Sequence, residues 1–86
     1  MTSTLFEPPV RSSFWTAEAA LRHSEGFRVE SPRGPVGYVE NVLLDEAEED
    51  VKALLVYDSA GRLRVPVGAI AWVDVARELI RLEGEP

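Results

Sequence analysis

From Gly26 onward, apolar residues alternate with polar ones in short runs that turn-forming residues separate. The segments "FRVES" (27–31) and "RLRVPV" (62–67) alternate cleanly, and in "RELIRLEG" (77–84) Ile80 and Leu82 share one face while Arg81 and Glu83 share the other. A period of two is typical of β-strands with one buried face. Two further runs, "VGYVENVLL" (36–44) and "VKALLVYD" (51–58), are apolar on both faces in their middle. The pattern predicts five short strands.

The connections between these runs predict how the strands are arranged. "SPRGP" (31–35) and "DSAG" (58–61) have the Pro, Asp and Gly residues of tight turns, and "DEAEED" (45–50) is a charged loop. Short connections join antiparallel neighbours, and a flat sheet of this size would leave exposed edges. The sequence therefore predicts a mainly β domain, a small antiparallel barrel of five to six strands.

The first quarter of the chain has a different character. Residues 1–12 contain Pro8 and Pro9 and are expected to form an N-terminal arm, which leaves residues 13–86 as a single domain. "TAEAALRHSEG" (16–26) predicts a helix over about 16–25, because Thr16 can cap it and Gly26 can end it. This helix, or a second subunit, is expected to cover the apolar outer face of the barrel.

The segment "VPVGAIAWVD" (65–74) combines a strand pattern with a proline. Pro66 cannot donate to a strand ladder, so it is expected to end the preceding strand. The following residues, "VGAIAW", are expected to make a short turn or a single helical turn. In that arrangement Ile70 points inward, and Ile70 and Trp72 close the open end of the barrel.

These segments together resemble the PRC-barrel family over about residues 26–83. The resemblance rests on "GYVENV" (37–42), which matches a Gly-x-Val strand, and on "VPVGAI" (65–70), which matches a strand ending in a proline corner. The family includes the cytoplasmic domain of the photosynthetic reaction-centre H subunit, the C-terminal domain of a ribosome maturation factor, and small stand-alone proteins. The chain is most similar to the stand-alone group. The resemblance implies a non-enzymatic interaction module.

Residues able to support catalysis or metal binding are few. The chain has no cysteine, and its one histidine, His23, lies near the expected helix end without a catalytic partner in the sequence. The loop 45–50 has five carboxylates but no glycine of the kind that calcium loops use, so a solvated loop is the better interpretation and a cation site the alternative. We therefore expect no enzyme activity and no cofactor.

The charge balance disfavours a dedicated nucleic-acid binder, since 15 acidic residues stand against 9 basic ones. The alternative is that arginines on the outward strand faces gather into a stripe that binds RNA. Pairing of these arginines with glutamates on neighbouring strands is the favoured interpretation. The arginines concerned are Arg28, Arg62, Arg64, Arg77 and Arg81.

The expected activity is binding of a protein partner or of a second copy of the chain. Large aromatic rings contribute most to such contacts, although the same rings also suit closure of a small core. The apolar outer faces of 42–44 and 53–57 are the second candidate surface. The predicted interface residues are Phe14, Trp15, Leu43, Leu54, Val56 and Trp72, with Tyr38 as a further anchor. No apolar run is long enough to span a membrane and no leader pattern is present, so we expect a cytoplasmic protein.

Overall fold

The computed structural model describes residues 17–47 and 49–84, which form one short helix and a six-stranded sheet. The predicted arm 1–12, Phe14 and Trp15 lie outside the described residues. The elements are α1 (Ala17–Arg22), β1 (Arg28–Ser31), β2 (Gly34–Leu44), β3 (Val51–Asp58), β4 (Gly61–Pro66), the 3-10 turn η1 (Val67–Ala69), β5 (Ile70–Asp74) and β6 (Leu79–Leu82). The prediction of a mainly β fold with a short helix is confirmed.

The strands lie in the order β4-β3-β2-β1-β6-β5. β1, β2, β3 and β4 follow one another as antiparallel neighbours, and β5 and β6 form a second antiparallel pair. The two groups join through β1 and β6, which are parallel, with Val29 opposite Ile80. The prediction of an entirely antiparallel sheet is wrong at this junction, because turn residues specify only the pairing of consecutive strands.

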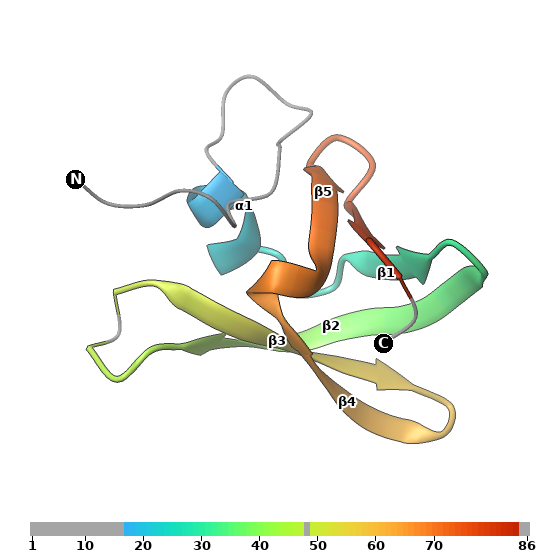
Figure 1. The fold of residues 1–86 in the computed structure, drawn as a ribbon, viewed down its shortest axis with the longest axis horizontal. Coiled ribbons are helices and arrows are strands. Elements are labelled where there is room, and N and C mark those ends of the chain that lie inside the picture. The colour runs from blue at the N-terminus through green and yellow to red at the C-terminus, as the bar shows by residue number, and fades with distance from the viewer. Residues whose placement is uncertain (1–16, 48, 85–86) are drawn as a thin grey trace.

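The described sheet is open, since β4 and β5 stand at its two ends and do not pair with each other. It is nevertheless strongly bent: β2, β3 and β4 run below, and β5 rises above them beside α1 (Figure 1). The core fills the concave side, and α1 and all six strands contribute to it. Its buried members include Leu21, Val29, Val39, Leu54, Val56, Val65, Val73 and Ile80.

The segment after Pro66 contains the predicted helical turn and also a strand that the sequence did not predict. η1 covers Val67–Ala69, and its end is closed by a hydrogen bond from the Ile70 N–H to the Val67 carbonyl. Ile70 is buried, with 3% of its surface exposed, as expected. It does not plug a barrel end, however, because β5 begins at Ile70 and pairs with β6. The small residues of η1 let the chain turn sharply, and the sheet continues into β5.

Helix α1 is shorter than predicted because a buried serine ends it. The Ser24 hydroxyl donates to the Leu21 carbonyl over 2.7 Å, and the Phe27 N–H then bonds to the Ser24 carbonyl. At the other end of α1, the Glu18 carboxylate accepts a 2.9 Å hydrogen bond from the Val51 N–H at the start of β3. The helix is thus fixed to the sheet by both polar and apolar contacts.

Candidate functional site

Two bulges determine which side chains of β2 and β3 face outward. The register skips one residue of β2 between Val39 and Asn41, and one residue of β3 between Ala53 and Val51. Side chains paired across neighbouring strands share a face of the sheet. Val39 and Val56 are paired, and both face the core. The next pair along the two strands, Tyr38 and Tyr57, therefore lies on the opposite, convex face of the sheet.

The outer face carries a row of four side chains from four neighbouring strands. Arg28 of β1 pairs with Tyr38 of β2, Tyr38 pairs with Tyr57 of β3, and Tyr57 pairs with Arg62 of β4. Tyr38 is 56% exposed and Tyr57 51%, which makes them the exposed large hydrophobic residues of the described chain. Two aromatic rings are therefore presented side by side, with an arginine at each end of the row.

Arg62 holds a fixed position across this row. Its guanidinium donates two hydrogen bonds to the Glu40 carboxylate, at 2.6 Å and 3.0 Å, and lies 5.9 Å from the centre of the Tyr57 ring. These hydrogen bonds, donated by Arg62 and accepted by Glu40, lower the pKa of Glu40 and raise the pKa of Arg62. Both groups are thus charged at neutral pH. Because Glu40 belongs to β2 and Arg62 to β4, the Arg62 side chain reaches across β3 to form this ion pair.

The two exposed tyrosines border a shallow hollow of about 390 Å³. Its remaining lining residues are Val39, Glu40 and Arg62. The hollow offers aromatic surface, tyrosine hydroxyls and one ion pair. The described residues that line it include no histidine, cysteine or serine that could act as a nucleophile or base. The arrangement suits contact with another molecule, and large aromatic and arginine side chains are the residues that dominate binding energy at protein interfaces.

The predicted interface residues separate into two groups within the described chain. Leu43 and Trp72 are half-buried; Leu43 lies on the outer face opposite Ala53, and Arg81 lies 5.7 Å from the centre of the Trp72 ring. Leu54 and Val56 lie in the core instead, with exposures of 0% and 1%. Their assignment to an outer surface is wrong, because the skipped residue between Val51 and Ala53 changes which residues of β3 face the core.

Tyr57 and Leu55 fall within the candidate surface 53–57 but are not among the individually predicted interface residues. Leu55 is the half-buried outward residue between Leu54 and Val56 in β3. Tyr57 was recognisable in principle, because it continues the outward alternation from Leu55. Tyr38, predicted as a further aromatic anchor, is exposed on the outer face.

Most of the arginines proposed for an RNA-binding stripe form ion pairs with acidic side chains. Arg28 and Arg81 both contact Glu30, at 3.7 Å and 4.0 Å, and Arg77 contacts Asp74 at 3.8 Å. Of these pairs, Arg81–Glu30 joins neighbouring strands, β6 and β1, as the favoured interpretation expects. The Arg62–Glu40 pair reaches across β3, and the other two pairs are local, within β1 and over three residues. Arg64 is the exception: it is exposed and has no ion pair among the described residues.

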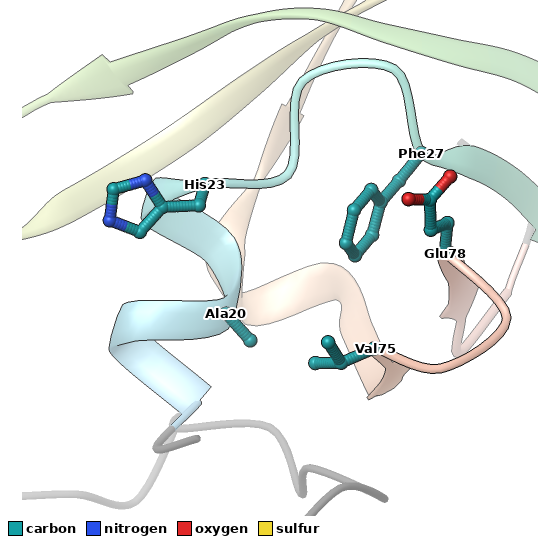
Figure 2. A pocket seen from close by; sticks show the side chains of 5 residues that line it. All are labelled: Ala20, His23, Phe27, Val75 and Glu78. Atoms are coloured by element: carbon teal, nitrogen blue, oxygen red, sulfur yellow. The ribbon is translucent and has the colours of Figure 1, made fainter. Parts of the chain in front are cut away.

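The acidic loop and His23 give no sign of a metal centre within the described ranges. The Asp45 carboxylate accepts a hydrogen bond from the Glu49 N–H, and Arg22 bonds to the Glu49 carbonyl. No group of three or more potential ligands occurs among the described residues. A small pocket of about 200 Å³ lies between α1 and the β5–β6 turn, and Figure 2 shows the His23 ring turned away from Phe27 there.

Comparison with known proteins assigns the chain to no family. No protein-family model matches the chain, and no curated protein matches it. None of the helices in residues 17–47 and 49–84 has the length and apolar character needed to cross a membrane. The outer face of β2, β3 and β4, with Tyr38 and Tyr57 at its centre, is therefore the candidate site on physical grounds alone.

Proposed function

We propose that this chain is a non-enzymatic, PRC-barrel-like interaction module that binds a protein through the outer face of β2, β3 and β4. The observation that supports it best is the exposed pair Tyr38 and Tyr57, directly opposite each other on adjacent strands. Rigid aromatic side chains lose little conformational entropy when a partner covers them. The two rings lie on a supported sheet, so little rearrangement is needed for binding.

A protein partner accounts for this face better than RNA does. Base stacking needs an accessible ring face, and Arg62 already lies over the Tyr57 ring. The charge of Arg62 is also balanced by Glu40, and the chain carries a formal charge of −6. Phosphate contacts would have to overcome that overall repulsion. We therefore place RNA second and a cation at the acidic loop third.

The test compares the intact chain with the double variant Tyr38→Ser, Tyr57→Ser. First, light scattering behind a sizing column over a dilution series shows whether the partner is a second copy. Second, immobilised wild type and variant are compared for capture from a nuclease-treated extract of the source organism. A matched control, Glu25→Ser with Glu83→Ser, changes two exposed residues elsewhere.

We expect wild type and control to bind the same protein, or to self-associate equally, and the tyrosine variant to lose this binding. All three proteins should give the same circular dichroism spectrum, because the substituted side chains are exposed. Equal binding by the tyrosine variant would contradict the proposed function. Binding seen from an untreated extract and absent from the nuclease-treated one would instead support RNA.

A further inference from the structure

β4 is an edge strand of the sheet that the described residues form. It stands at one end of the strand order, and no described strand pairs with its far side. The β3–β4 hairpin projects to the side of the molecule away from α1 (Figure 1). The other edge strand, β5, lies against α1. An exposed edge presents unpaired N–H and C=O groups that can accept an additional strand.

The register identifies which main-chain groups of β4 point outward. In an antiparallel pair, alternate residues direct their N–H and C=O groups away from the neighbouring strand. Arg62, Arg64 and Pro66 form one alternate set, opposite Tyr57, Leu55 and Ala53. The absence of an N–H on Pro66 is tolerated at an outward position. Arg62 and Arg64 therefore offer their main-chain groups to the free edge.

The side chains of β4 set the chemistry of an added strand. Arg62 and Arg64 are on the outer face, and β4 contains no acidic residue. Leu63, between them, is half-buried and packs against the core from the concave side. Since Glu40 balances the charge of Arg62, a neighbouring strand would meet the positive charge of Arg64 on one face and apolar surface on the other, because side chains alternate along a strand.

We infer that the β4 edge binds an extended strand of a partner protein in which acidic residues alternate with apolar ones. This inference rests on the proposed function and specifies the partner's chemistry. A second copy pairing through its own β4 is disfavoured, because Arg62 and Arg64 would then face arginines. In an acidic strand, carboxylates would lie beside Arg64, which has no ion pair among the described residues.

The test uses a defined peptide rather than an unknown partner. The ¹⁵N-labelled intact chain is titrated with the peptide Ser-Glu-Val-Glu-Val-Glu-Ser, and amide shifts are followed by NMR. We expect shifts concentrated at residues 61–66 and slowed hydrogen exchange at the Arg62 and Arg64 amides. The matched peptide with lysine in place of glutamate should bind about tenfold more weakly, since cross-strand attraction becomes repulsion.

Charge reversal provides a test that does not depend on peptide choice. Arg64→Glu changes an exposed side chain, so its melting curve should match wild type. This variant should prefer the lysine peptide over the glutamate peptide. Unchanged preference would show that Arg64 does not face the ligand and would overturn the inference, as would peptide shifts that fall away from β4.

Two further outcomes separate the inference from the proposed function. Failure of the glutamate peptide to bind, combined with loss of partner capture by the tyrosine variant, overturns the edge-strand inference and leaves the proposed function standing. Wild-type capture by the tyrosine variant overturns the proposed function itself. Tight binding of a single-stranded oligouridylate at the same residues, without peptide binding, would assign the site to RNA.

Discussion

Gly37 lies where β2 approaches β3 too closely for any larger residue. A Cβ atom at this position would lie 2.4 Å from the Tyr57 carbonyl oxygen, 3.0 Å from the Tyr57 carbonyl carbon and 3.1 Å from a Val56 methyl group. The first two are main-chain atoms, so no side-chain rotation can relieve the contact. Gly37→Ala therefore requires β2 and β3 to separate locally, beneath the exposed tyrosine pair.

The expected cost is that of overpacking, about 1–3 kcal/mol. A domain of this size has a total free energy of unfolding of about 4–13 kcal/mol. At roughly 4–8 °C for each kcal/mol, the substitution should lower the melting temperature by about 4–24 °C. Because main-chain atoms form the obstruction, we expect the decrease in melting temperature to lie above the middle of that range.

The measurement is thermal and urea unfolding followed by circular dichroism, on wild type, Gly37→Ala and the control Gly84→Ala. A Cβ atom at Gly84 would meet no heavy atom within 4 Å, so the control should melt like wild type. A Gly37→Ala protein that melts within about 2 °C of wild type would refute the argument from close strand approach. A partly folded variant would still report its loss of stability through the urea midpoint.

Two further substitutions test the core and the outer ion pair. Ile70→Asp places a carboxylate at a buried position without a partner and should unfold the domain by circular dichroism, whereas Ala60→Asp in an exposed turn should not. If the Ile70 variant melts like wild type, the burial of this side chain is wrong. Glu40 has a pKa below its ordinary 4.5 in the folded chain, because it bonds to Arg62. Its stabilising effect is therefore present above about pH 4.5 and lost as the pH falls through the folded pKa. The difference in melting temperature between wild type and Glu40→Gln should shrink from pH 7 to pH 3. A difference that stays constant over this range would count against the ion pair.

Local sequence patterns predicted the strands that hairpins connect. β3 has the predicted bounds, and β2 and β4 differ from theirs by two residues or fewer, because period-two alternation and turn residues act over a few positions. Gly34, with a φ of 134°, supplies the left-handed backbone that the 31–35 turn requires. β5 was missed because the proline and small residues before it are also typical of a loop.

The site was harder to predict than the fold. The aromatic residue Tyr38 was identified, but the outward set of β3 was assigned in the wrong phase. A single skipped residue reverses which side chains face the core, and nothing in "VKALLVYD" distinguishes a bulge from an unbroken strand. The parallel contact between β1 and β6 was not predicted for a related reason: pairing between distant segments leaves no local signature.

The junction of β1 with β6 has a consequence for how the chain folds. The strands β1 to β4 form a meander of neighbouring hairpins, each of which can close over a short loop. Arg28 and Leu79, by contrast, are partners separated by about 50 residues of sequence. Contacts between distant segments slow folding, so we expect docking of the β5–β6 hairpin onto β1 to be the late step. Until that step, the open side of β1 would be the segment most exposed to misassembly.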